Sequence, residues 1–207
     1  MTLVAAGVAG AAALAYGLWY CHRAPSLLRS VIKTLPLAVM AGLAFFAAAP
    51  LVLVAGFALS ALGDLALSRR GEAAFLTGLI GFAAAHIAYI WVFAGMAQGA
   101  LPLVPAVILL IYAASSELWL APHTGTLRWP VRGYVALIAG MGLMALMLPV
   151  GYGIVTLGAV LFIASDTLLA VQMFRMAADH PLQRVVSVAL WALYIAAQGL
   201  ILWGFTS

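Results

Sequence analysis

The chain has 207 residues, of which 67% are hydrophobic and only 7% are charged. Soluble domains carry about 25% charged residues, so this composition excludes an ordinary soluble protein and indicates a polytopic membrane protein. The net charge of +4 reflects basic residues in loops and is no sign of nucleic-acid binding. The single cysteine, Cys21, cannot form an internal disulfide, and no Cys/His cluster in the sequence has the spacing of metal ligands.

Long apolar runs divide the chain. A membrane-spanning helix needs about 20 apolar residues. Runs of this kind predict eight spans, at residues 2–20, 31–48, 51–68, 73–97, 101–120, 131–148, 151–175 and 185–205. The first run has no preceding basic residues and no convincing cleavage site, so we expect a retained helix and no signal peptide. The sequence therefore predicts an all-α bundle with short loops, forming a single membrane domain over residues 1–207.

Basic residues occur only at every second connector. The connectors at 47–50, 98–102 and 148–151 carry no charge, whereas the other four hold every basic residue. These residues are Arg23, Arg29, Lys33, Arg69, Arg70, Arg128, Arg132, Arg175 and Arg184. By the positive-inside rule, the four basic connectors are expected in the cytoplasm and both termini on the periplasmic side. The Ala-rich chain with minimal loops favours a bacterial inner membrane.

Two aspartates lie inside the apolar runs, in similar settings: Asp64 follows Gly63 and Asp166 follows Ser165. An ionised carboxylate at membrane depth is costly unless it is paired or hydrated, which makes both residues functional candidates. At 1.5 Å per residue, Asp64 lies roughly 7 Å, and Asp166 about 13 Å, from the basic boundary of its helix. Both therefore belong to the cytoplasmic half, where we expect one shared polar cleft. Gly63 would leave room there for a ligand or water.

Other polar residues of the spans are candidates to bind substrate or orient the acids. They are Lys33, Ser60, His86, Tyr112, Glu117, Tyr134, Ser165, Tyr194 and Gln198. Lys33 could face and partly neutralise the aspartates. Structural alternatives stay open: Asp64 could pair with Arg69 or Arg70, and Lys33 and Glu117 could be purely structural. A membrane histidine such as His86 is often a packing residue, and tyrosines and glutamines often bond between helices.

Several motifs follow one another in a fixed order. They are Lys33-Thr34-Leu35-Pro36, Ser60-x-x-Gly63-Asp64, Phe75-x-x-Gly78-x-x-x-Phe82-x-x-x-His86-x-x-Tyr89, Gly158-Ala159-x-Leu161-Phe162-x-x-Ser165-Asp166-x-x-Leu169-Ala170 and Tyr194-x-x-x-Gln198. In order and spacing they resemble the YhhN/TMEM86 family of integral membrane lysoplasmalogenases over nearly the whole chain. The resemblance implies hydrolysis of the vinyl ether bond of a lysoplasmalogen to a fatty aldehyde and a glycerophospho-ethanolamine or -choline. The implied partners are a lysophospholipid substrate and membrane lipids.

The chemistry of vinyl ethers suits a pair of carboxyl groups. Protonation of the β-carbon gives an oxocarbenium ion, water adds, and the hemiacetal collapses to an aldehyde. This needs one protonated acid and one carboxylate, a division of labour similar to that of glycoside hydrolases. We expect Asp166, the deeper residue, to donate the proton and Asp64 to activate water, although the reverse assignment is also open. The reaction requires neither cofactor nor metal.

Two other functions compete with hydrolysis. A small-molecule or lipid transporter would also need intramembrane acids, for proton coupling, although few helix-breaking residues mark a discontinuous-helix site. Metal-assisted hydrolysis could use Asp64, Asp166, Glu117 and His86 as ligands, but their spacing does not favour it.

Overall fold

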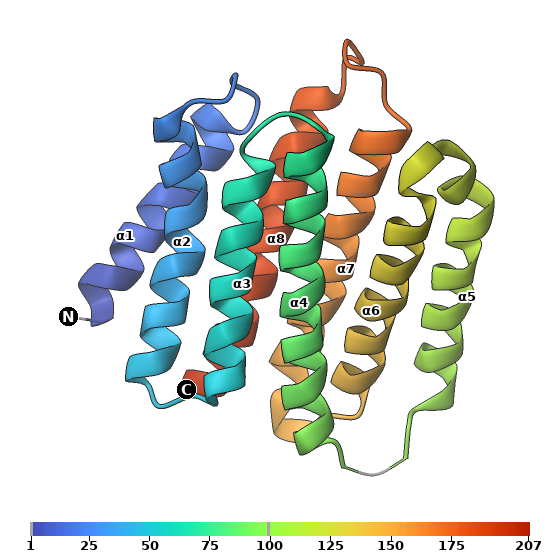
Figure 1. Ribbon diagram of the computed structural model, residues 1–207. Helices are drawn as coiled ribbons and strands as arrows, with labels where there is room; N and C mark the ends of the chain where they lie inside the picture. The colour runs from blue at the N-terminus through green and yellow to red at the C-terminus, as the bar shows by residue number, and fades with distance from the viewer. Residues whose placement is uncertain (1, 99) are drawn as a thin grey trace.

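The computed structural model describes residues 2–98 and 100–207. Over these residues it contains eight α-helices and no β-strand, which confirms the all-α prediction (Figure 1). The helices are α1 (Thr2–Ala15), α2 (Leu27–Phe46), α3 (Leu51–Leu67), α4 (Glu72–Met96), α5 (Leu103–Trp119), α6 (Arg128–Leu146), α7 (Gly153–Phe174) and α8 (Gln183–Thr206). A π-helical turn, Tyr16–Tyr20, extends α1.

Seven of the helices, counted with their adjoining turns, are long and apolar enough to cross a membrane. The eighth, α3, is apolar but has only 17 residues. That length is at the lower end of the range of about 17–25 residues for membrane-spanning helices. The chain is a multi-pass integral membrane protein, and one of its shortest helices carries Asp64.

The connectors alternate between two ends of the bundle (Figure 1). The four connectors near basic residues lie at the upper end, whereas the uncharged ones lie at the lower end. Prolines precede two of the helices that begin at the lower end: Pro50 precedes α3 and Pro102 precedes α5. At the upper end Ser26 caps α2, accepting a hydrogen bond from the backbone N–H of Arg29 at 3.1 Å. One end of the bundle is therefore basic and the other uncharged.

Small residues bring α3 and α4 into close contact. A Cβ atom on Gly81 would lie 3.1 Å from the Cα of Gly63. One on Gly63 would lie 2.8 Å from the ring of Phe82. The expectation that Gly63 leaves room for a ligand is therefore wrong, because Phe82 fills that space. The glycine instead lets the helices pack closely, as small residues do in membrane bundles.

The second aspartate-bearing helix, α7, packs closely against α8. A Cβ on Gly158 would lie only 2.9 Å from the backbone oxygen of Ala197 on α8. By contrast, α5 lies at the outer edge of the bundle beside α6 (Figure 1) and buries only Ala106 and Ser116. The two aspartates are thus held by tightly packed helices, while α5 covers the bundle loosely.

Candidate active site

Both aspartates line one cavity of about 340 Å³, which we call the polar cavity. Its walls come from the π-helical turn after α1 and from α2, α3, α4, α7 and α8, at the basic end of the bundle. Its polar lining residues are Tyr16, Cys21, Arg29, Lys33, Asp64, Arg69, Arg70, Ser165, Asp166, Gln172, Ser187 and Tyr194. Two acids that lie far apart in the sequence therefore face one space, as the sequence predicts.

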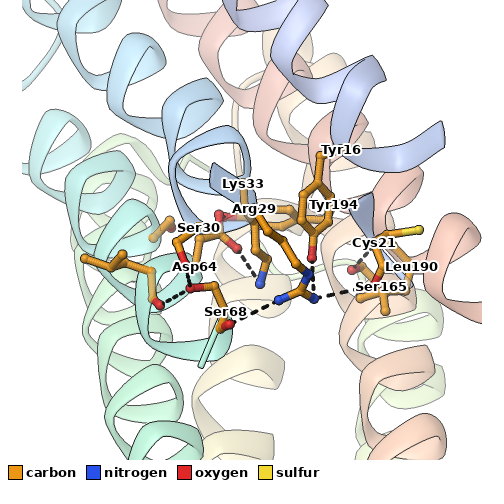
Figure 2. Close-up of polar contacts among 12 residues, drawn as sticks. Tyr16, Cys21, Arg29, Ser30, Lys33, Asp64, Ser68, Ser165, Leu190 and Tyr194 are labelled. Carbon is orange, nitrogen blue, oxygen red and sulfur yellow. Dashed lines mark hydrogen bonds and ion pairs between the residues drawn. The ribbon is translucent and has the colours of Figure 1, made fainter. Parts of the chain in front are cut away.

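Asp64 is almost completely buried and has two polar partners. Its Oδ1 lies 3.2 Å from the Nζ of Lys33, and its Oδ2 accepts a hydrogen bond from the Tyr194 hydroxyl at 2.8 Å (Figure 2). The side chains of Lys33 and Asp64 are only 11% and 2% exposed. The alternative in which Asp64 pairs with Arg69 or Arg70 is not what the structure shows. Lys33 instead forms a buried ion pair with it.

Arg29 holds the walls around this ion pair. Its guanidinium donates to the backbone oxygen of Tyr20 at 3.0 Å. It also donates to the backbone oxygen of Ser68 at 3.1 Å and to the Tyr16 hydroxyl at 3.0 Å (Figure 2). It thereby connects α1, α2 and the end of α3 one helical turn from Lys33. From the sequence, Arg29 is expected only as one of the basic residues of a cytoplasmic connector. Its spacing could have indicated a place in the site: Arg29 lies four residues before Lys33, and residues four apart lie on the same face of a helix.

Asp166 has different surroundings. Its Oδ2 accepts a hydrogen bond from the Tyr134 hydroxyl at 2.5 Å. Across residues 2–98 and 100–207, no lysine or arginine nitrogen forms an ion pair with it. The neighbouring Ser165 is turned away to α8, where its hydroxyl donates to the Leu190 carbonyl at 2.9 Å. Asp166 is thus bonded to a neutral group, whereas Asp64 is bonded to a cation.

The mouth of the polar cavity is basic. Arg69 and Arg70 are exposed and line it, and in the described part of the chain their side chains form no hydrogen bond or ion pair. Cys21 lies at the same rim, and its Sγ donates to the Gly17 carbonyl at 3.2 Å. Burial raises the pKa of the Cys21 thiol, which disfavours the nucleophilic thiolate. The rim therefore offers positive charge rather than a nucleophile.

A second buried network lies one helical turn from Asp64 and Tyr194. The Tyr89 hydroxyl donates to Oε1 of Gln198 at 2.7 Å, and Nε2 of Gln198 donates to the Ser60 hydroxyl at 3.1 Å. These side chains do not line the polar cavity. The contacts join α3, α4 and α8 and support the helices that present Asp64 and Tyr194.

His86 lies beside the Asp166 partner rather than in the polar cavity. Its Nδ1 is 2.7 Å from the Phe82 carbonyl, and its Nε2 is buried without a partner in the part of the chain that the structure describes. The ring lies edge-on to the ring of Tyr134, with 5.2 Å between centroids. His86 therefore contacts the tyrosine that bonds Asp166.

Two further candidates lie outside the polar cavity. Glu117 is exposed, and its carboxylate forms a bidentate ion pair with Arg132 across the α5–α6 connector. The Tyr112 hydroxyl is hydrogen-bonded to Thr167 on α7. Among the residues described, no group of three or more His, Cys, Asp or Glu side chains is placed to hold a metal ion.

Several known proteins are similar in sequence to this chain. A lysoplasmalogenase TMEM86B of Sus scrofa is 33% identical over 195 residues, which cover 89% of this chain and 78% of that protein. A lysoplasmalogenase of Mycobacterium tuberculosis is 32% identical over 160 residues, covering 74% of this chain and 59% of its own length. The lysoplasmalogenase TMEM86B of Homo sapiens is 31% identical, covering 89% and 78%. No solved structure matches the chain. Residues 28–205 match the YhhN family, and the chain therefore belongs to that family.

Proposed function

We propose that this chain is a membrane hydrolase that cleaves the vinyl ether bond of lysoplasmalogens. The substrates are alkenyl glycerophospho-ethanolamines or -cholines. The products are a fatty aldehyde and glycerophospho-ethanolamine or -choline. The observation that carries the proposal is that Asp64 and Asp166 line one cavity in different charge environments. The names of the relatives supply the substrate class.

In the first step Asp166 is the proton donor. Its Oδ2 is occupied by the Tyr134 hydroxyl, which leaves Oδ1 to carry the proton. The π electrons of the vinyl ether form the new C–H bond at the β-carbon as Asp166 gives up this proton. A lone pair of the ether oxygen then stabilises the positive charge on the neighbouring carbon as an oxocarbenium ion. A positioned general acid contributes typically 10²–10⁴-fold to such a step.

In the second step Asp64 is the base. Its carboxylate, paired with Lys33 and Tyr194, stabilises the cation and takes a proton from the attacking water. The resulting hemiacetal collapses when Asp64 returns that proton to the glycerol oxygen and Asp166 takes the proton of the new hydroxyl. One water is consumed and both carboxyl groups regain their starting states, so the residues need no metal or other cofactor.

The phosphate of the headgroup belongs at the basic mouth. Arg69 and Arg70 lie there, and cations near a membrane surface attract anionic headgroups. By the positive-inside rule this mouth faces the cytoplasm, both termini are periplasmic, and the bacterial inner membrane is the site of action. The glycerophospho-ethanolamine or -choline would accordingly leave into the cytoplasm.

Aldehyde release tests this proposal. Purified protein in detergent is mixed with alkenyl lysophosphatidylethanolamine or alkenyl lysophosphatidylcholine, with and without a chelator, and the aldehyde is trapped and quantified. We expect catalytic release that the chelator does not change. If folded protein releases no aldehyde from either headgroup class, the hydrolase proposal fails, and proton-coupled transport by the same acids becomes the function to test in liposomes.

A further inference from the structure

A second hollow adjoins the polar cavity on the other side of Asp166. It consists of a cavity of about 80 Å³ among α4, α5, α6 and α7, and one of about 250 Å³ farther down between α5, α6 and α7. The two share Leu109, Tyr112 and Ile163 as lining residues. We call them together the apolar groove.

Asp166 stands at the boundary between the two spaces. It lines both the polar cavity and the apolar groove, together with Phe75, Leu169 and Met173. On the side of the polar cavity the walls carry Lys33, Asp64 and arginines, whereas the groove is lined mainly by aliphatic and aromatic side chains. The polarity of the site therefore changes at the residue that the mechanism uses as the acid.

Most hydroxyl groups that line the groove are already bonded within the protein, and Ser116 on α5 is the exception among the described residues. Tyr112 bonds Thr167, Thr167 donates to the Ile163 carbonyl at 2.7 Å, and Thr156 donates to the Ala145 carbonyl at 2.7 Å. What they leave for a ligand is apolar surface. From Asp166 to Thr156 the groove follows about ten residues of α7, or about 15 Å at 1.5 Å per residue.

The groove opens toward the lipid. Residues on its α5 and α7 walls are strongly exposed, including Ile108 at 62% and Val160 at 52%. The loosely packed α5 lies at the edge of the bundle (Figure 1). The hydrogen bond between Tyr112 and Thr167 links α5 to α7 beside the groove, one residue from Asp166.

From this arrangement we propose that the apolar groove binds the single hydrocarbon chain of the substrate, which enters sideways from the bilayer between α5 and α7. This inference rests on the proposed function. In an alkenyl lysolipid the vinyl ether bond is the junction of the polar headgroup and the apolar chain. A headgroup in the polar cavity and a chain in the apolar groove place that bond at Asp166. The groove then sets which chain lengths are accepted.

Narrowing the groove tests this inference. A side chain at Gly142 would enter it, because a Cβ there would lie 2.8 Å from Leu109 and 2.9 Å from Ile163, both ends of flexible side chains. Gly142→Leu should lower kcat/KM for a long-chain alkenyl lysolipid by about tenfold or more relative to a short-chain analogue, since one methylene alone can change specificity by roughly tenfold. Val160→Trp, at an exposed position lower in the groove, should likewise lower the ratio of kcat/KM for the long-chain substrate to that for the short-chain analogue.

The matched control is Gly133→Leu on the same helix, where a new Cβ would have no neighbour within 4 Å. Gly133→Leu should keep the parent's ratio of kcat/KM for long-chain to short-chain substrate. If Gly142→Leu does not fold, Val160→Trp decides the question. If the folded variants keep the parent's activity and its ratio of kcat/KM for long-chain to short-chain substrate, this inference is overturned while the proposed function stands. No aldehyde from the parent at any chain length would overturn the proposed function, and the inference with it.

Discussion

The two aspartates of the site face the same cavity but have opposite surroundings. Asp64 is buried, is paired with Lys33 and accepts a hydrogen bond from Tyr194. Asp166 accepts a hydrogen bond from Tyr134, has no ion-pair partner among the described residues, and borders an apolar groove. A carboxyl group beside a cation suits a base, and one beside neutral and apolar groups suits an acid.

The difference shows how one site can separate acid from base without different residue types. Both residues are aspartates on helices that run toward the basic end of the bundle. What separates them is the helix that faces each: α2 brings Lys33 to Asp64, and α6 brings Tyr134 to Asp166. The proposed roles of the two acids would therefore be set by packing.

The largest expected effect comes from replacing each acid. Asp166→Asn removes the proposed proton donor and should lower kcat by about 10²–10⁴-fold. Asp64→Asn should lower activity comparably, but it also leaves Lys33 buried without its partner, at a cost in stability of about 3–5 kcal/mol. Aldehyde release and thermal unfolding in detergent measure the two effects. Equal stability of the two variants would contradict the contrast drawn between the acids.

Removing the cation sharpens the same comparison. Adding Lys33→Met to Asp64→Asn removes the unpaired charge, so the double variant should regain at least about 1 kcal/mol of stability over Asp64→Asn. Its activity should stay as low as that of Asp64→Asn, because the base is still missing. Adding Lys33→Met to Asp166→Asn is the matched control and should be destabilising. Recovery of activity in the Asp64→Asn double variant would show that Asp64 is no base.

The two tyrosines should give smaller and unequal effects. Tyr194→Phe and Tyr134→Phe each remove one hydrogen bond to an aspartate, worth about 1.5–3 kcal/mol where the acceptor is charged. Tyr194→Phe should cost more stability, since its partner is the ion-paired carboxylate. Tyr134→Phe should act mainly on kcat, because it frees the oxygen of the acid. Paired kcat and unfolding measurements decide this, and the reverse pattern would exchange the roles of the two acids.

The exposed ion pair should give the smallest effect. Glu117→Gln breaks its contact with Arg132 outside the polar cavity, and exposed pairs contribute little to stability. We expect kcat/KM within about twofold of the parent, a change too small to show a missing site contact. A loss of tenfold or more would place Glu117 in the substrate site after all.

The helices and the meeting of the two aspartates could be predicted from the sequence. Charged residues in long apolar runs must find each other or water, which is why Asp64, Asp166 and Lys33 could be grouped from their positions in the chain. The placing of basic residues at alternate connectors likewise separates the two ends of the bundle.

Pairwise choices between helices were out of reach. Asp64 has arginines five and six residues away and Lys33 on another helix, and the sequence could not decide which of these cations pairs with it. Glu117 pairs across a connector with Arg132, which the pattern of apolar spans cannot anticipate. The groove depends on how loosely α5 packs, and composition carries no information about that. Such features follow from crossing geometry rather than from local pattern.

The most direct test of the central claim is to run the reaction in D₂O. If Asp166 protonates the β-carbon, the aldehyde released by the parent should carry one deuterium on the carbon next to the carbonyl, in a single configuration. Rapid reduction to the alcohol preserves the label for mass spectrometry and NMR, and Asp166→Asn should release aldehyde about 10²–10⁴-fold more slowly than the parent. Aldehyde without deuterium at that carbon, or release by Asp166→Asn at the parent rate, would contradict the account.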